Sequence, residues 1–398
     1  MPAAGSLTAS QRDWLRVRSY LVEHRYDLAL DAAADYPADR KVDGTPLLAA
    51  PGWRPAEPIP LRDVALEFAP DSGPSGAGPG AAGPAGPAVG AALFLPERPD
   101  GTRYPRYSDA LRDLAAPAVF ENRPTYRLTE AELGPGAARL AFARGRYFDG
   151  VDTGEAAAHE YAAARLGAAP AAPAGPAAPA GPAALVGPAG LRALIADPCD
   201  LRRRPANLAI STLTIRLEAA TGHASFLLHW RDPAKVGHAG GLYQVIPVGI
   251  FQPSGEAAWH ERGDFSLWRC MVREFAEELA GHPEDYGAGP VDYESWPFAR
   301  RMTAALGRGQ IRVWCLGLGV DPLTYATDLL TVAVIDSGVF DELFGLGPRG
   351  NDEGRVLAAR EFAAPVVDRL AAREPVQAAG AAVLRLAWRH RQALGCPP

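Results

Sequence analysis

The chain has 398 residues and a mass of 42.0 kDa, enough for two or three domains with a sizeable core. Its 48% hydrophobic and 22% charged residues are ordinary for a globular protein. A net charge of −6 argues against a broad nucleic-acid footprint, and the sequence has neither a signal segment nor a run of about twenty apolar residues, so we expect a cytoplasmic protein with no membrane partner.

The cysteines and histidines show no zinc or disulfide spacing. The four cysteines are far apart, so we expect buried free thiols in a reducing cytoplasm: Cys199, Cys270, Cys315 and Cys396. The histidines match no zinc pattern, and His229, within an apolar strand, is typical of a core residue.

Residues 10–35 have helical patterns that end at Tyr36-Pro37. One interpretation is a helix-turn-helix whose phosphate contacts would be Arg12, Arg16, Arg18, His24 and Arg25. The other is an ordinary amphipathic helix over a core. We favour the second, because interspersed aspartates would repel a phosphate backbone. DNA is therefore a partner that the charge does not support.

The middle of the chain alternates structured and low-complexity segments. We expect strands at 61–68 and 140–148, a short helix at 111–114, an extended segment at 119–128, and a helix from Gly154 to Leu166 capped by Thr153. Segments 70–90 and 167–190 are rich in Gly, Ala and Pro, and we expect a loop and a spacer there. Arg202-Arg203-Arg204 is either a phosphate grip or a solvated loop.

The second half is denser in core material. We predict a hairpin from 206–217 and 225–230, one buried strand over 242–251, further strands at 310–318 and 329–335, and helices between 355 and 393 that break at Pro365 and Pro375.

The segment 267–281 carries the clearest chemistry. Asp264 and Ser266 offer N-cap oxygens, and Gly281 closes a helix of about three to four turns. Glu274, Glu277 and Glu278 then share one face, at positions i, i+3 and i+4. Three carboxylates on one face repel one another unless a cation lies among them, and such oxygen ligands suit Mg²⁺ or Mn²⁺. A solvated acidic face is the alternative.

The segment Arg273-Glu-Phe-Ala-Glu-Glu278 resembles the core of the Nudix box, Arg-Glu-apolar-x-Glu-Glu-x-Gly-apolar. Upstream, Pro247-Val-Gly-Ile-Phe-Gln-Pro-Ser-Gly-Glu256 resembles the strand and loop that enter this box. The resemblance implies a loop–helix–loop in which Glu274, Glu277 and Glu278 bind Mg²⁺ and serve catalysis. It also implies that Gly249, Glu256 and Arg273 belong to the substrate-binding part, and that the substrate is a nucleoside diphosphate linked to another group.

Two positions and one spacing depart from the pattern. Val248 stands where the first box glycine is expected, and Ala280 stands where the glycine after the paired glutamates is expected. The spacing from Glu256 to Arg273 is about twice that of the pattern, which indicates an insertion at 257–267. These departures affect the loop that would position the substrate, whereas the three helix glutamates are retained.

We therefore predict an α+β protein with a Nudix-like mixed sheet between helices. The predicted parts are an N-terminal helical region (1–69), a loop (70–90), an α/β region (91–166), a spacer (167–190), a Nudix-like domain (191–345) and C-terminal helices (346–398). More loosely, the whole chain resembles an actinobacterial group that carries this box and whose members are often labelled transcriptional regulators.

Three functions stay open at this point. The first is a Mg²⁺-dependent hydrolase of a nucleoside-diphosphate-type pyrophosphate, in which Glu277 and Glu278 bind metal and Glu274 binds metal or helps deprotonate water. The second is a non-catalytic Nudix-like sensor of a nucleotide or metabolite, acting as a transcriptional regulator. The third is a scaffold, which leaves the carboxylate face unexplained. The sequence specifies neither the ligand nor the oligomeric state.

Overall fold

The computed structural model describes residues 7–70, 94–117, 119–134, 136, 138–167, 190–231, 241–283, 289–345, 354–356 and 359–396. The predicted loop 70–90 and spacer 167–190 lie outside the described residues apart from residues 70, 167 and 190.

A mixed sheet lies at the centre of the protein. In the described part of the chain its strand order is β1-β10-β11-β5-β6-β13, and β9 also pairs with β5. These strands are β1 (Ile59–Pro60), β5 (Leu208–Glu218), β6 (His223–Phe226), β9 (Val248–Ile250), β10 (Ile311–Val320), β11 (Thr327–Asp336) and β13 (Arg360–Glu361). The pair β5–β11 is parallel and the other pairs are antiparallel.

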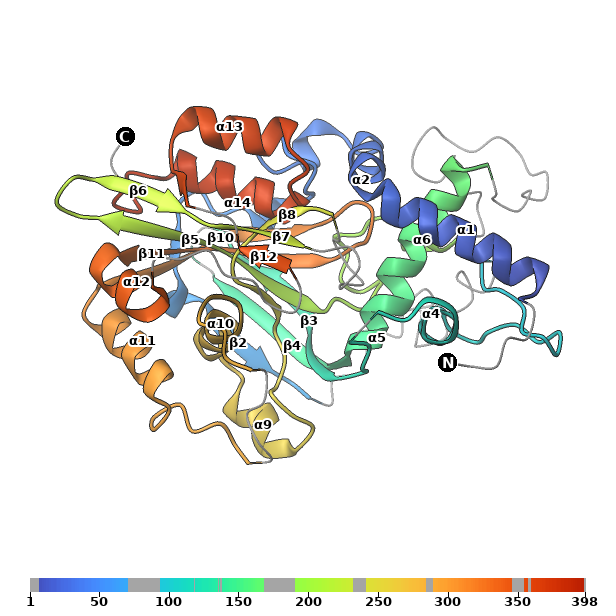
Figure 1. Cartoon of the computed structure of the whole chain (residues 1–398), viewed down its shortest axis with the longest axis horizontal. Helices are drawn as coiled ribbons and strands as arrows, with labels where there is room; N and C mark the ends of the chain where they lie inside the picture. Colours follow the sequence, from blue (N-terminus) through green and yellow to red (C-terminus); the bar gives the residue numbers. More distant parts are fainter. Residues whose placement is uncertain are drawn as a thin grey trace.

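Helices cover both faces of this sheet, which explains why β5 and β11 are buried along nearly their whole length. Figure 1 shows α13 (Ala364–Arg373) and α14 (Ala378–Arg389) on one side, with α10 (Leu267–Glu274), α11 (Pro297–Gly307) and α12 (Ser337–Phe344) on the other. Helix α14 packs on β5, β10 and β11, and α12 packs on β5 and β11. The predicted α+β class, with a mixed sheet between helices, is confirmed.

Two smaller sheets complete the strand structure of the described residues. The first has the order β12-β7-β8, from β12 (Gly354–Val356), β7 (Leu228–Arg231) and β8 (Tyr243–Val245). The second has the order β2-β4-β3, from β2 (Ala65–Phe68), β4 (Arg139–Arg146) and β3 (Pro124–Glu132). The β3 backbone N–H groups of Tyr126 and Leu128 donate to the carbonyls of Phe251 (3.2 Å) and Ala206 (2.9 Å). The N-terminal strands therefore lie directly against the segment that follows β9.

The N-terminal helices form a layer beside the sheets (Figure 1). The layer contains α1 (Ala9–Glu23), α2 (Arg25–Ala34), α4 (Tyr107–Ala115), α5 (Tyr147–Gly150), the π-helical η4 (Val151–Glu155), α6 (Ala156–Arg165) and α8 (Leu191–Ile195). Short 3₁₀ turns connect the layer to the sheets: η1 (Ala38–Arg40), η2 (Pro51–Trp53) and η3 (Leu61–Asp63). Arg18 and Arg25 are buried and both bind the buried carboxylate of Glu155, so these two predicted phosphate contacts are used inside the protein.

Several local expectations are confirmed. The predicted helices within 10–35 are α1 and α2, and the late strands are β10 and β11. The hairpin is present as β5–β6 with a turn at Gly222, but the predicted second strand 225–230 is divided: β6 ends at Phe226, and β7 pairs with β8 in another sheet. The four cysteines are buried and free. Among the described residues, no helix is long and apolar enough to cross a membrane.

Several local predictions are wrong. In the predicted strand 61–68 the first three residues form the 3₁₀ turn η3, and in the predicted strand 140–148 the last two residues begin α5. Thr153 does not cap a helix, because it lies inside η4 and the chain is already helical from Tyr147. Residues 242–251 do not form one strand, because the chain changes direction at the cis bond Ile246–Pro247: β8 pairs with β7, and β9 pairs with β5. Pro365 does not break a helix but lies in the first turn of α13, where its missing N–H costs nothing.

Candidate functional site

The predicted glutamate helix begins at Ser266 and ends before Gly281. The Ser266 side chain accepts a hydrogen bond from the Arg269 N–H at 3.4 Å, and Gly281 has a φ of +74°, which favours glycine. Asp264, the other predicted cap, has a different role that is described below. Cys270, Met271, Phe275 and Leu279 are buried against the core.

The second half of this helix is π-helical. After α10 the chain continues as η5 (Phe275–Leu279), where the Ala280 N–H donates to the Phe275 carbonyl at 3.1 Å, five residues back. A π-helical turn holds more residues than an α-helical turn, and such turns are frequent at functional sites. Glu274 therefore closes the α-helical part, whereas Glu277 and Glu278 lie in the wider turn.

Two of the three glutamates meet at the backbone of β9. One edge of β9 pairs with β5, and the other edge faces α10. On that open edge the Val248 N–H donates to Glu278 Oε1 at 3.1 Å, and the Cys270 thiol donates to the Ile250 carbonyl at 3.5 Å. Between these two residues, the Glu274 carboxylate lies next to Gly249, in the space that a side chain at position 249 would fill.

Glycine is required at position 249 by that contact. A Cβ on Gly249 would lie 1.9 Å from the carboxyl carbon of Glu274 and 2.0 and 2.2 Å from its oxygens. The carboxylates of Glu274 and Glu278 thus converge on two consecutive residues of β9, Val248 and Gly249. The predicted substrate-binding residue Gly249 is part of the site through its missing side chain.

Glu277 is half-buried and lies within electrostatic reach of Cys270. Burial raises the pKa of the Cys270 thiol to about 12, nearby Arg273 opposes this rise, and Glu274 and Glu277 add to it. Deeper in the protein, His229 Nδ1 of β7 lies 3.9 Å from Glu278 Oε2, and both side chains are buried. His229 is therefore a core residue, as its strand context predicts, and it also borders the glutamate cluster.

Arg273 holds the loop that follows β9. Its guanidinium is buried and donates to the Gln252 carbonyl at 2.6 Å and to the Tyr293 hydroxyl. It also lies 3.3 Å from Asp264 Oδ1, with both side chains buried. A buried arginine with these partners fixes the loop relative to the helix, so we assign Arg273 a positioning role.

The predicted insertion forms a short helix, α9 (Ala258–Gly263), and Asp264 anchors its end. Asp264 Oδ2 accepts from the Ser254 N–H at 2.8 Å and from the Ser254 hydroxyl at 2.6 Å. Its other oxygen accepts from the Tyr293 hydroxyl at 2.7 Å. The acidic side chain that the sequence presented as a helix cap instead ties the inserted segment to Arg273.

The N-terminal sheet holds the outer side of α9. Arg144 of β4 binds the Glu261 carboxylate through two hydrogen bonds of 2.7 and 2.9 Å, and the Tyr126 hydroxyl donates to the Glu261 carbonyl at 2.7 Å. Glu256, predicted to bind substrate, is exposed and forms an ion pair with Arg146 at 2.8 Å. The structure thus places Glu256 on the surface between the inserted segment and β4.

Two other features of the chain have structural explanations. Arg202 pairs with Asp200 at 2.9 Å. Arg204 is buried and donates hydrogen bonds to the Pro198 carbonyl and the Thr327 hydroxyl, so the arginine triplet does not form one phosphate grip.

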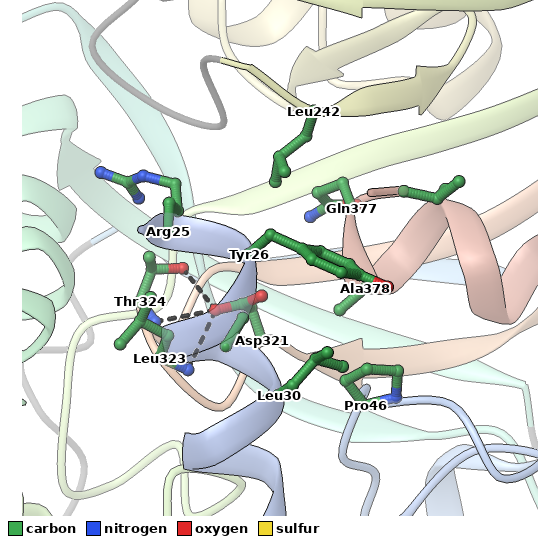
Figure 2. Close-up of a pocket in the computed structure, with 12 residues that line it drawn as sticks. Arg25, Tyr26, Leu30, Pro46, Leu242, Asp321, Leu323, Thr324, Gln377 and Ala378 are labelled. Carbon is green, nitrogen blue, oxygen red and sulfur yellow. Dashed lines mark hydrogen bonds between the residues drawn. The ribbon is translucent and has the colours of Figure 1, made fainter. Parts of the chain in front are cut away.

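Figure 2 shows a crevice between α2, the β10–β11 turn and the start of α14. Its free space of about 20 Å³ holds about one water molecule, which excludes a nucleotide.

Glu274 and Glu278 place carboxylate oxygens beside the open edge of β9, and carboxylate oxygen is a ligand type that Mg²⁺ accepts. On that edge the Val248 N–H already donates to Glu278, and the Ile250 carbonyl already accepts from the Cys270 thiol. Within the residues that the structure describes, no three His, Cys, Asp or Glu side chains form a metal-binding group. A cation would therefore need backbone oxygen or solvent beside the two carboxylates.

No protein-family model and no curated protein match this sequence. Among solved structures, the chain is similar to a Nudix hydrolase from Alicyclobacillus acidocaldarius, with 16% sequence identity over 45% of this chain and 90% of that one. The TM-score is 0.27, too low for this similarity to establish a shared fold.

Proposed function

We propose that this protein is a Nudix-like hydrolase that uses Mg²⁺ or Mn²⁺ to cleave a nucleoside-diphosphate-type pyrophosphate. The observation that carries the proposal is the convergence of Glu274 and Glu278 on the open edge of β9 at Val248 and Gly249. The sequence motif supplies these residues at the required spacing. A glycine at position 249 is the one residue that leaves room for the Glu274 carboxylate.

The protein residues have distinct tasks in this proposal. Glu274, at the end of α10, and Glu277 and Glu278, in the π-helical turn, would hold the cation. When bound, the cation supplies charge neutralisation and polarisation of a phosphoryl oxygen. Arg273 fixes the loop after β9, and a glutamate of the cluster takes a proton from the attacking water. Hydrolysis adds one water across the P–O–P linkage and yields two phosphorylated products.

The experiment is a turnover assay on the full chain with a panel of nucleoside diphosphate derivatives and either metal. Release of nucleoside monophosphate or phosphate should fall by orders of magnitude in Glu274→Gln, Glu277→Gln and Glu278→Gln, since metal ligands and base act as one unit. Glu294→Gln, an exposed glutamate outside the cluster, is the matched control. Turnover that survives in all three cluster variants would exclude this site.

The burial of Glu278 favours a second candidate function. Glu278 is only 8% exposed and accepts a hydrogen bond from the Val248 backbone, which is a structural use of a carboxylate. We therefore retain a non-catalytic Nudix-like sensor of a nucleotide or metabolite, which would act as a transcriptional regulator. Calorimetry that detects nucleotide binding without product after prolonged incubation would decide for the sensor. Glutamate-dependent turnover would decide for the hydrolase.

The cation has its own test, independent of turnover. Mg²⁺ or Mn²⁺ should raise the melting temperature of the wild type, because a ligand that binds only the folded state stabilises it. Glu278→Gln should lose this response while it keeps the far-ultraviolet spectrum of the wild type. An unchanged response in both Glu277→Gln and Glu278→Gln would show that the metal binds elsewhere.

A further inference from the structure

A second cavity lies on the side of the central sheet that α14 covers, and no residue of the glutamate helix lines it. Its walls come from residues 42–43 and 53–55, from the middle of β10, from Leu330 of β11, and from the C-terminal half of α14. Its free volume is about 160 Å³. A cavity of roughly 150 Å³ in a protein core accommodates benzene, so this space fits a six-membered ring.

The inner wall is apolar and well buried. The side chains that form it are Trp53, Leu316, Leu318, Leu330 and Leu386. Protein interiors rarely leave space larger than a water molecule, because lining atoms without contacts lose dispersion energy. These apolar side chains can contact the hydrophobic part of a ligand, while polar atoms make up nearly half of the surface that the cavity exposes.

The mouth of the cavity carries an excess of positive charge. Arg54 and Arg389 lie there with one carboxylate, Asp43, which pairs with Arg389. Arg54 is exposed and forms no ion pair with any residue that the structure describes. The three charged groups sum to one positive charge next to the apolar wall. Guanidinium groups bind carboxylates through paired N–H donors, so the charge at the mouth fits an organic acid.

A β-bulge shapes this wall of the cavity. The register of β10 against β11 shifts between Cys315 and Gly317, and Gly317 has a φ of +143°. A Cβ at position 317 would lie 2.9 Å from the Trp53 carbonyl, so glycine allows the segment of Trp53 to approach the strand. Bulges are over-represented next to binding sites, where they redirect side chains. Here the bulge positions the Trp53 segment as one wall of the cavity.

We propose that this cavity is a binding site for a small aromatic or cyclic carboxylate. The ring would occupy the space between Trp53 and the leucines, and the carboxylate would bind Arg54 and Arg389 at the mouth. The proposal is independent of the hydrolase site. Because the walls come from three distant parts of the chain, a bound ligand would stabilise the contacts between the N-terminal region, β10 and α14.

The test uses the full chain, with benzoate as the probe. Benzoate should raise the melting temperature in a concentration-dependent way, and calorimetry should detect saturable binding. Benzylamine, with a similar ring and opposite charge, should do neither. Arg54→Met should weaken benzoate binding by at least about tenfold, the lower end for a charged hydrogen bond. Arg62→Met, an exposed arginine nearby that does not line the cavity, should bind like the wild type.

A second variant tests the cavity itself. Leu386→Phe places a larger side chain in the space and should abolish benzoate binding. If this variant fails to fold, Arg54→Met still decides, because Arg54 is exposed and its replacement disturbs no core contact. The proposal is overturned by wild-type protein that binds no benzoate, by equal binding of benzylamine, or by undiminished benzoate binding in Arg54→Met.

Discussion

Replacement of Gly249 by alanine separates the proposed site from the stability of the fold. The strand conformation at Gly249 has no positive φ, so alanine can adopt it. The atoms nearest to the added Cβ would be the end of the Glu274 side chain, with its carboxyl carbon at 1.9 Å. A glutamate side chain can rotate away, whereas a backbone could not. Gly249→Ala should therefore displace the Glu274 carboxylate and leave β9 paired with β5.

The expected energies nearly cancel in the absence of metal. Alanine in a strand is favoured over glycine by about 0.5–1 kcal/mol, and moving Glu274 off its rotamer costs about 0.5–1.5 kcal/mol. In the presence of metal, the wild type and Gly249→Ala should differ in their free energy of unfolding. At a concentration of about 100 times the wild-type Kd, metal stabilises the wild type by about 2.7 kcal/mol. If displacement of Glu274 weakens metal binding about a hundredfold, the same metal concentration stabilises Gly249→Ala by only about 0.4 kcal/mol.

The assay is urea unfolding with and without Mg²⁺ or Mn²⁺, followed by far-ultraviolet circular dichroism. Gly338→Ala is the control for a bare glycine-to-alanine change, since a Cβ at Gly338 in α12 meets nothing within 4 Å. It should keep the full metal response. Gly249→Ala with an undiminished metal response would refute the contact between Gly249 and Glu274 as the basis of the site.

Two further predictions concern buried charge. Asp264→Asn should destabilise the protein by about 3–5 kcal/mol in urea unfolding, because it leaves the buried Arg273 without its carboxylate partner; the exposed Asp292→Asn should change little. Burial lowers the pKa of His159 to about 3, helped by Arg18, from a reference value near 6.5. Only the unfolded state then gains a proton as the pH falls below about 6.5, so stability is lost from there towards pH 3, and His159→Gln should reduce the slope of unfolding free energy against pH in that range.

Local sequence patterns predicted the elements around the glutamate helix well. Ser266, Gly281 and the spacing of apolar residues define the helix, and each depends on neighbours within about one or two turns. The resemblance to a known box also identified Gly249, whose contact with Glu274 the structure describes. The π-helical turn at Phe275–Leu279 has no comparable sequence signal, so the different environments of Glu277 and Glu278 were not predicted.

Long-range partners account for most of what the sequence did not predict. Asp264 satisfies the rule for a helix cap, but its partner Tyr293 follows 29 residues later and draws the carboxylate away. In the sequence Arg18 and Arg25 are typical of phosphate contacts. In the structure both bind Glu155, which follows them by 137 and 130 residues. The apolar run 242–251 was predicted as one strand although Pro247 lacks the N–H that a central strand needs. Both halves are strands, and only their pairing partners differ.

The hydrogen bonds that join β3 and β4 to Glu261 of α9 have a consequence for the order of events during synthesis of the protein. The Tyr126 hydroxyl and its partner carbonyl on Glu261 are separated by 135 residues. At about 5–20 residues per second, the ribosome exposes Tyr126 roughly 7–27 seconds before that partner is synthesised. During this interval Phe142 of β4 and Tyr126 of β3 lack the rings of Phe251 and Phe265 that later cover them. A nascent chain stalled before residue 251 would present an aromatic strand surface to chaperones.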